Sequence, residues 1–313
     1  MKPYLTDTRY EGWLTEICEA FDLDGRASFS PLLGGTANVS FVLDAEERVI
    51  VTFCVGLSVQ RAERLAGLLE HLGLHGFATN RLLRSKSGDR VHVVSGVPTI
   101  VKSFIVGDPV GAVDEAIASR IGAVLGRLHK VPAPPDPAPD HAMDIESMQR
   151  VVDGARDSTF TAWVAAALRT LPKDWGELPE GVVHGDLIPD NLIECPDGSL
   201  IPIDFEEACL HPLVFDVGMS LFGLAHVHSL TPQTAASLLA GYEAERVLSP
   251  SERELIPTMV EYSSAMTACW RFDLGQREGP PAGELRDWRE ARPPHAQSVE
   301  WRRSGIWSTL LGS

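Results

Sequence analysis

The sequence predicts an α+β fold of two lobes, with an antiparallel sheet in residues 1–106 and a mainly helical second lobe in residues 107–313 that carries one β-hairpin. Two observations lead to this prediction. Short β-prone runs, separated by turn residues and interrupted by one helical stretch, fill the first lobe. Beyond them, apolar residues recur mainly at helical spacing. We place the domain boundary after Val106, where the first pattern gives way to the second.

The composition fits an ordinary globular protein of this size. A chain of 313 residues is long for one compact core and natural for two lobes. Hydrophobic residues make up 44% and charged residues 22%, which is typical of soluble proteins. The formal net charge of −16 argues against a nucleic-acid partner, since such proteins need a basic surface. The same charge favours solubility and is compatible with Mg²⁺ or a cationic substrate.

The five cysteines are scattered, without a CxxC pair or a Cys/His cluster, so no zinc site is predicted. A reducing, cytoplasmic environment is the simplest expectation. The first residues open no apolar run, and we therefore expect no signal peptide. We also expect no membrane association, because no uncharged apolar stretch reaches about 18 residues. The sequence leaves the oligomeric state open.

The first lobe begins with a helix, because Trp13, Ile17 and Phe21 share one helical face. The pattern then changes to β runs, with Gly34-Gly35 as the turn between the first two. Ser58 is a suitable N-cap for a second helix. The predicted elements are, in order, a helix within 5–22, strands at 28–33, 39–43 and 49–54, a helix over 59–72, and strands at 79–83, 91–94 and 99–105.

In the second lobe, apolar residues from Ala116 to Leu128 form one helical face. A proline-rich stretch at 132–140 predicts a stiff connector inside this lobe. Pro196-Asp197-Gly198 predicts a hairpin turn, because Pro fixes φ and Gly allows positive φ. The predicted elements are helices between 143 and 172, a strand at 181–183, hairpin strands at 191–194 and 199–203, and helices near 213–228, 231–245, 251–274 and 296–311.

This hairpin and the loop before it place two carboxylates and one carboxamide at fixed offsets. Asn191 stands five positions after Asp186, and Asp204 follows the second hairpin strand. The hairpin would bring Asn191 and Asp204 side by side at its open end, with Asp186 on the preceding loop. Phosphoryl transfer uses such a set: one Asp accepts the proton of the attacking hydroxyl, while an Asn and a second Asp hold Mg²⁺ against the phosphates. The kinase catalytic loop has the same Asp-to-Asn offset.

The stretch from His184-Gly185-Asp186 through Asn191, followed by 203–208 and Asp216, resembles the aminoglycoside phosphotransferase and choline kinase superfamily. Within it, the chain is most similar to bacterial homoserine kinases of the kinase-like type. The resemblance implies a two-lobed protein-kinase-like fold, ATP and Mg²⁺ as cofactors, and a small-molecule hydroxyl as acceptor. Further matching segments are the phosphate loop at 34–38, the helix end at 125–129 and the aromatic-basic run at 270–272.

We expect Asp186 to be the catalytic base and His184 a scaffold that hydrogen-bonds the loop backbone. Asn191 and Asp204 are the expected Mg²⁺ ligands, since oxygen donors suit this hard cation. By the resemblance, Asp216 steadies the loop from the next helix.

For the nucleotide, we expect the backbone of Gly34, Gly35 and Thr36 to approach the phosphates. The backbone of Ser103 and Ile105, where the chain crosses between lobes, is expected to pair with adenine.

One feature departs from the usual kinase pattern. The third strand of the first lobe, 49–54, carries no Lys, and Thr52 stands near the expected position. Homoserine kinases of this type can also lack that Lys, which favours them over the antibiotic kinases.

The expected acceptor is a small amino-acid alcohol, with homoserine as the first choice. Arg271 could bind an α-carboxylate through its planar fork. Asp190, Glu206 or Glu207 could hold the α-ammonium group. An aminoglycoside or choline-type kinase is the alternative, although a choline kinase needs an aromatic cage and no aromatic residues cluster beside the catalytic loop in the sequence.

Two interpretations from other classes stay open. A degenerate kinase that only binds nucleotide is one, since loss of a charge-assisted phosphate contact costs roughly 1.5–3 kcal/mol. A metal-dependent hydrolase is the other, and it would use His184, Asp186, Asp204 and His211 as its ligands and acids.

Overall fold

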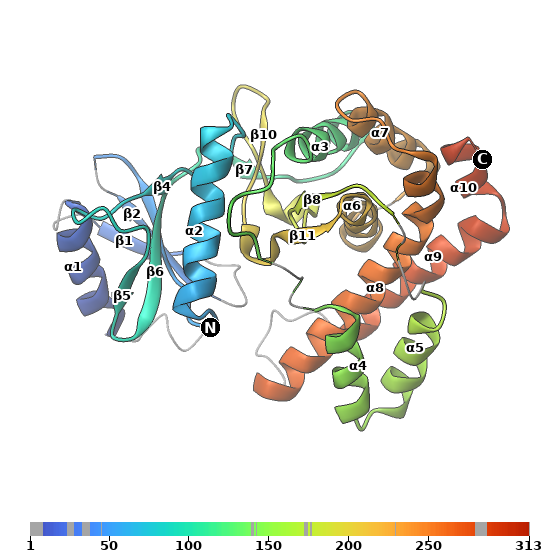
Figure 1. Ribbon diagram of the computed structural model, residues 1–313, viewed down its shortest axis with the longest axis horizontal. Coiled ribbons are helices and arrows are strands. Elements are labelled where there is room, and N and C mark those ends of the chain that lie inside the picture. The colour runs from blue at the N-terminus through green and yellow to red at the C-terminus, as the bar shows by residue number, and fades with distance from the viewer. Residues whose placement is uncertain are drawn as a thin grey trace. The chain divides into compact units, whose positions relative to one another are not determined.

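The computed structural model describes residues 9–23, 28–32, 38–44, 46–138, 141, 143–171, 175, 177–228, 230–278 and 287–312 (Figure 1). Its contacts divide the chain into two compact units. Unit 1 comprises residues 1–106 together with 134–138, and unit 2 comprises residues 107–133 and 139–313.

Unit 1 is built on one antiparallel sheet. Its described strands run in the order β1-β2-β3-β6-β4. β4 pairs with the later residues of β6, and β5 pairs with its first residues. The elements are α1 (Arg9–Phe21), β1 (Ser28–Pro31), β2 (Val39–Asp44), β3 (Val49–Phe53), α2 (Val59–Leu74), β4 (Leu82–Leu83), β5 (His92–Val94) and β6 (Val97–Ser103).

The sheet and α1 share one hydrophobic core. Along β2, buried and partly exposed residues alternate, as period two requires for a strand with one covered face. Leu14 and Ile17 of α1 pack into the cluster that holds Phe41 and Phe53 of the sheet. The Ser58 side chain accepts a hydrogen bond from the Arg61 N–H and caps α2 at the predicted residue.

The strand predicted at 79–83 is wrong over most of its length, because only Leu82–Leu83 pairs with β6. The Asn80 side chain instead donates from Nδ2 to the Ser103 carbonyl at 2.9 Å. A side-chain amide therefore satisfies the edge of β6 where a longer strand was expected.

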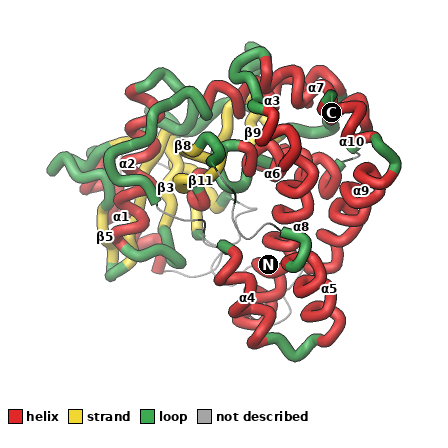
Figure 2. The backbone as a smooth tube through the Cα atoms, turned by 45° about the vertical axis from the view of Figure 1, so that its right-hand side comes forward, coloured by secondary structure: helices red, strands yellow, loops and turns green. Residues whose placement is uncertain are grey.

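Unit 2 is mainly helical (Figure 2). Its elements are β7 (Asp108–Pro109), α3 (Glu115–Leu128), α4 (Ile145–Gly154), α5 (Ser158–Leu168), β8 (Glu180–Val183), η2 (Pro189–Asn191), β9 (Leu192–Glu194), β10 (Leu200–Pro202), η3 (Phe205–Glu207), β11 (Cys209–Pro212), α6 (Val214–Val227), α7 (Pro232–Glu243), α8 (Pro250–Glu278), η4 (Trp288–Ala291), α9 (Arg292–Arg303) and α10 (Ile306–Leu311).

Two small sheets in unit 2 hold the predicted hairpin and loop. The hairpin strands β9 and β10 are antiparallel, and β7 pairs with the other edge of β9. The strand before the loop, β8, pairs with β11. The segment Val214–Leu224 of α6 is buried throughout and forms the centre of this unit.

The proline-rich connector is placed differently from our expectation. Residues 134–138 group with unit 1 rather than with the second lobe. There Asp136 Oδ2 lies 3.2 Å from Arg64 Nε of α2, a tertiary ion pair that no local pattern reveals. In the part of the chain that the structure describes, no helix is both long and apolar enough to cross a membrane.

Candidate active site

The loop after β8 has a backbone that only glycine permits at its centre. Gly185 has φ of +86°, and a Cβ there would overlap the Glu207 carbonyl oxygen. His184 is fully buried beside it: its Nε2 donates to the Ile203 carbonyl at 2.9 Å, and its Nδ1 accepts from the Asp186 N–H at 3.3 Å. Burial holds the pKa of His184 below its usual value, so the ring stays neutral. Both ring nitrogens are engaged in loop structure, which leaves His184 unsuited to the metal-ligand role of the hydrolase interpretation.

Asp216 of α6 binds the backbone of the same loop. Its Oδ2 accepts from the His184 N–H at 2.7 Å, and its Oδ1 accepts from the Gly185 N–H at 3.0 Å. His129 Nε2 lies 3.1 Å from Oδ2. Burial would raise the pKa of Asp216, but the hydrogen bond with His129 and the one from the His184 N–H hold it below its usual value. A buried carboxylate thus fixes two consecutive backbone amides next to Asp186.

Asp186 and Asn191 face each other across the loop. Asn191 Nδ2 donates to the Asp186 carbonyl at 2.8 Å and to Asp186 Oδ2 at 3.0 Å. These two bonds use the amide donors of Asn191 and direct its Oδ1 away from Asp186. Burial, followed by the charge of Asp204, raises the pKa of the half-buried Asp186 to about 8, against the hydrogen bond from Asn191.

Asp204 has a backbone conformation that is uncommon for a residue with a side chain. Its φ of 68° and ψ of 60° lie in the left-handed region. The Ile203 N–H donates to the Asn191 carbonyl at 3.0 Å, so Asn191 and Asp204 stand next to each other at the open end of the hairpin. Left-handed non-glycine residues cost of order 1–3 kcal/mol and are frequent at functional sites.

Glu206 does not occupy the position that strand periodicity predicted. The second hairpin strand ends at Pro202, and the chain continues as a short 3₁₀ helix over Phe205–Glu207. Glu206 is half-buried in this turn, and Asp190 is exposed in η2. The carboxylate that acts on Asp186 besides Asp204 is Glu207, whose charge also raises the Asp186 pKa.

Arg271 of α8 contributes a positive charge to this site. Its charge lowers the pKa of Asp186, in opposition to Glu207. Arg271 Nη2 donates to His226 Nε2 at 2.8 Å, and Nη1 lies 3.6 Å from Glu290 Oε2. His226 Nε2 accepts this bond and therefore carries no proton. Nδ1 of the same ring donates to the Glu290 carbonyl at 3.1 Å.

Sequence reasoning missed His141, which directly follows the proline-rich stretch 132–140 and belongs to no helix or strand pattern. Its Nδ1 accepts from the Met143 N–H at 3.0 Å, and its Nε2 lies 3.3 Å from the Gly185 carbonyl and 3.9 Å from Glu207 Oε2. Aromatic rings gather behind it, a feature that no stretch of the sequence shows. The ring centroids are 5.7 Å apart for His141 and Phe215, 4.8 Å for His211 and Phe215, 5.6 Å for Phe215 and Tyr262, and 5.5 Å for Trp175 and Tyr262.

The predicted nucleotide residues are only partly placed. Gly34, Gly35 and Thr36 lie outside the described residues. The Ser103 N–H donates to the Arg81 carbonyl at 2.8 Å, and the Ser103 carbonyl accepts from Asn80 Nδ2 at 2.9 Å, so both backbone groups already have partners within unit 1. Ile105 is half-buried just beyond β6. Thr52, where a kinase Lys was expected, is buried with its hydroxyl 3.0 Å from that of Ser40.

Comparisons with solved structures agree with this architecture. A microcompartment-associated aminopropanol kinase superposes with a TM-score of 0.71 at 17% identity, covering 95% of this chain and 98% of that one. A choline kinase from Streptococcus pneumoniae gives a TM-score of 0.68 at 17% identity, covering 95% of this chain and 99% of that one. These likenesses confirm the predicted two-lobed, protein-kinase-like α+β fold.

Sequence comparisons define the family. Homoserine kinase from Phenylobacterium zucineum is 30% identical over 288 residues, which cover 87% of both chains. Homoserine kinase from Gluconobacter oxydans is 26% identical over 269 residues, 80% of this chain and 85% of that protein. The model of the phosphotransferase enzyme family matches residues 28–255 and so includes the loop, the hairpin and Asp216. The chain therefore belongs to the phosphotransferase enzyme family.

Proposed function

We propose that this phosphotransferase is a kinase that uses ATP and Mg²⁺ to phosphorylate the hydroxyl of a small amino-acid alcohol, with homoserine as the first choice. One observation carries the proposal. The Asp186 carboxyl is hydrogen-bonded to Asn191, and its pKa is raised by the charges of Asp204 and Glu207 and lowered by the charge of Arg271. Asn191 and Asp204 suit a metal ion that binds phosphate. Glu207 and Arg271 suit the ammonium and carboxylate groups of a zwitterion.

Asp186 is the proposed base. It is hydrogen-bonded in place by Asn191, and its pKa of about 8 lies close to physiological pH. A general base works best when its pKa is near the operating pH. The acceptor hydroxyl would give its proton to the Asp186 carboxylate as it attacks the terminal phosphate. His184 and Asp216 do not touch the reacting atoms in this scheme but hold the loop backbone.

Asn191 and Asp204 are the proposed metal ligands, and the residues present fit a hard divalent cation. The Asn191 amide donors are taken by Asp186, so the side chain presents an oxygen elsewhere. The left-handed Asp204 adds a carboxylate at the adjacent position. When bound, the cation neutralises the phosphate oxygens during transfer. The charges of Asp186 and Asp204 also repel each other without it, which favours cation binding.

Unit 1 would supply the nucleotide contacts. We assign the phosphates to the backbone of Gly34, Gly35 and Thr36, and the adenine to Ser103 and Ile105. Because Thr52 replaces the strand Lys, amide groups and the cation must meet the phosphate charge. Homoserine kinases are among the relatives, and one structural neighbour, an amicoumacin kinase, was solved with AMP-PNP and Ca²⁺.

The acceptor assignment follows from the two opposite charges. An amino-acid alcohol has an ammonium group and a carboxylate within a few ångströms of its hydroxyl. Glu207 would hold the first and Arg271 the second, with Asp190 and Glu206 further out on the same loop and turn. The names of the relatives, homoserine kinase, agree with such a substrate.

A choline-type amine is the second candidate, because of the aromatic group formed by Phe215, Tyr262, Trp175 and His211. No aromatic residues cluster beside the catalytic loop in the sequence, but the fold assembles this group next to His141, which contacts Gly185. Aromatic faces attract quaternary ammonium groups. Choline and an amino alcohol without a carboxylate are therefore included among the substrates to be compared.

The deciding experiment compares kcat/KM for L-homoserine with that for L-serine, L-threonine, 1-amino-2-propanol, choline and an aminoglycoside. We expect L-homoserine to be the best substrate. Arg271→Ala should raise KM for the amino acid about 10-fold or more, since a charge-assisted contact is worth roughly 1.5–3 kcal/mol. Arg289→Ala, on the neighbouring η4, is the matched control and should leave KM unchanged. Preference for choline over homoserine would reject the amino-acid assignment and keep the kinase.

A separate titration tests the metal site. Asp204→Ala should abolish Mg²⁺-dependent ATP binding in calorimetry. Intact Mg-ATP binding in this variant would show that the metal ligands lie elsewhere.

A further inference from the structure

The helices α3 and α7 approach each other so closely that their contact requires glycine. A Cβ at Gly122 would overlap the Leu238 carbonyl, and a Cβ at Gly241 would overlap the Ser119 carbonyl. One turn further along α3, a Cβ at Gly126 would lie 2.8 Å from the Tyr242 carbonyl. This close crossing brings Tyr242 beside His129, the residue at the end of α3.

A hydrogen-bonded chain starts from this contact and reaches the catalytic loop. Arg246 Nη1 lies 2.8 Å from the Tyr242 hydroxyl and 2.8 Å from Glu252 Oε1. The Tyr242 hydroxyl lies 2.9 Å from His129 Nδ1. His129 Nε2 lies 3.1 Å from Asp216 Oδ2, which in turn holds the His184 amide. Tyr242, Glu252 and Asp216 are completely buried.

The chemistry of its two ends fixes the direction of every bond in the chain. The Arg246 guanidinium can only donate, so the Tyr242 oxygen accepts from it. The single Tyr242 proton is then directed to His129 Nδ1, which must be an acceptor. With Nδ1 accepting, the ring proton of His129 sits on Nε2 and is donated to Asp216, a carboxylate that can only accept. Burial raises the pKa of Tyr242, so its hydroxyl keeps the proton that this chain needs.

We propose that Tyr242 and Arg246 are positioning residues for the catalytic loop: they fix His129 as the Nε2–H tautomer, and this donor sets the orientation of the Asp216 carboxylate. Asp216 then presents one oxygen to the amide of His184 and the other to that of Gly185. Because those amides immediately precede Asp186, a rotated Asp216 would displace the base. The inference concerns the loop and does not depend on the identity of the acceptor.

The first test measures the ring itself. The ¹⁵N signals of the His129 ring in the wild-type protein should show a proton on Nε2 and none on Nδ1. An Nδ1–H tautomer in the wild-type protein would overturn the proposal, whatever the substrate and whether or not any variant folds.

The second test removes the hydroxyl. Tyr242→Phe should lower kcat about 10–100-fold, the usual effect of losing a residue that orients a functional group, and leave KM for ATP within about twofold. The His129 ¹⁵N signals should change at the same time. A wild-type kcat, or a lower kcat with an unchanged His129 tautomer, would contradict the proposed role.

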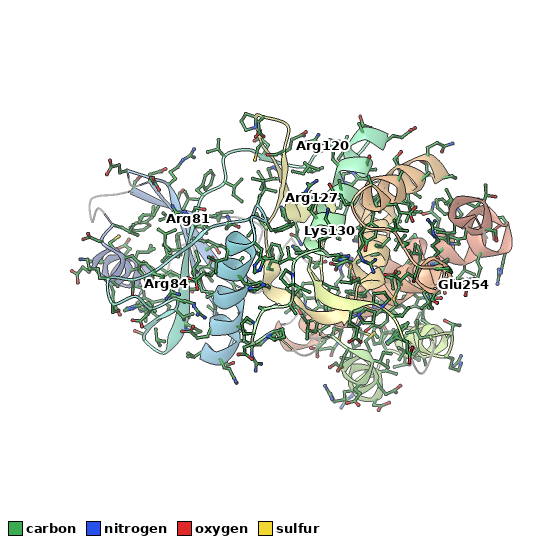
Figure 3. All side chains as sticks on the ribbon, turned by 45° about the horizontal axis from the view of Figure 1, so that its top comes forward. Arg81, Arg84, Arg120, Arg127, Lys130 and Glu254 are labelled. Atoms are coloured by element: carbon green, nitrogen blue, oxygen red, sulfur yellow. The ribbon has the colours of Figure 1, made fainter. Side chains whose placement is uncertain are left out.

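Two controls separate positioning from general stability. Arg127→Gln breaks the 3.4 Å ion pair between Arg127 of α3 (labelled in Figure 3) and Glu245, which follows α7, and should leave kcat unchanged because this pair lies outside the hydrogen-bonded chain. His129→Gln replaces the ring with an amide donor that has no tautomers. In that background, Tyr242→Phe should have little further effect on kcat. An equal loss in both backgrounds would show that Tyr242 does not act through His129.

Discussion

Asp186 sits in surroundings that oppose its charge. Burial and the charges of Asp204 and Glu207 raise its pKa to about 8, while an unfolded Asp titrates near 3.9. Between about pH 4 and pH 8, the folded protein therefore holds a proton that the unfolded chain has lost. Raising the pH favours the state that binds fewer protons, which is here the unfolded chain. The contribution of Asp186 to folding stability therefore falls as pH rises through this window.

Removing that charge should stabilise the metal-free protein. Asp186→Asn keeps an oxygen for Asn191 Nδ2 but cannot ionise, so its Tm should exceed that of the wild type. The difference in Tm should grow from about pH 5 to pH 8 and then level off. Each kcal/mol of added folding stability corresponds to a Tm higher by about 2–4 °C. Thermal unfolding without divalent cations measures it. Asp197→Asn, in the exposed hairpin turn, is the control, and an Asp186→Asn Tm equal to that of the wild type at every pH would refute the argument.

The hairpin β9–β10 is held at the end opposite to Asn191 and Asp204. Arg120 of α3 donates to Glu194 Oε1 at 2.7 Å and also to the Gly198 carbonyl, so it joins the first hairpin strand and the hairpin turn to one helix. On the other side, β7 pairs with β9, and Gly107 fits closely against the Glu194 carbonyl. The proposed metal ligands thus depend on contacts at the far end of their element.

Arg120→Gln should weaken Mg-ATP binding without unfolding the protein. The pair with Glu194 is partly exposed, so we expect a loss of about 1 kcal/mol, or roughly fivefold in Kd. Arg84 makes the same kind of contact in unit 1, to Glu70 and the Gly88 carbonyl (Figure 3), and Arg84→Gln is the matched control. Equal affinities in wild type and Arg120→Gln, measured by calorimetry, would show that this clamp does not position the ligands.

Elements set by local chemistry were predictable from the sequence. Ser58 caps α2, and Pro196-Asp197-Gly198 turns the hairpin, because capping and turn preferences involve only neighbouring residues. The offset of Asn191 from Asp186 likewise marked the loop. The left-handed Asp204 was not predictable, and strand periodicity misplaced Glu206 for that reason.

Contacts between distant segments were also beyond the sequence. His129 ends one helix and Tyr242 lies on another, and the glycines beside them in the sequence do not by themselves indicate that these two helices meet. His141 and the aromatic group around Phe215 likewise depend on tertiary packing. Side-chain roles that rest on such packing need the fold before they can be assigned.

For the whole molecule, the buried titrating groups predict a stability maximum. Burial lowers the pKa of His184, His211 and His295, so each resists protonation in the folded protein. Below about pH 6.5 the unfolded chain takes up these protons and stability falls. Asp186 acts in the opposite direction between about pH 4 and pH 8, and above about pH 6.5 the histidines no longer offset its effect, so stability declines.

The Tm of the metal-free protein should therefore peak near about pH 6.5 and decline on both sides. Asp186→Asn should remove only the decline on the alkaline side, since the histidines are unchanged. A Tm that rises steadily from about pH 5 to pH 8 would contradict the raised pKa of Asp186, and a Tm that falls steadily over that range would contradict the assignment of these histidines as neutral.

The rate of the chemical step tests the central role of Asp186 most directly. With saturating Mg-ATP and the best acceptor, rapid-quench single-turnover experiments compare the wild type with Asp186→Asn. General-base catalysis typically contributes 10²–10⁴ in rate, so the variant should transfer phosphate slower by about that factor while its Kd for ATP stays within about twofold. Transfer at the wild-type rate by Asp186→Asn would show that another group accepts the proton, and that the loop does not act as proposed.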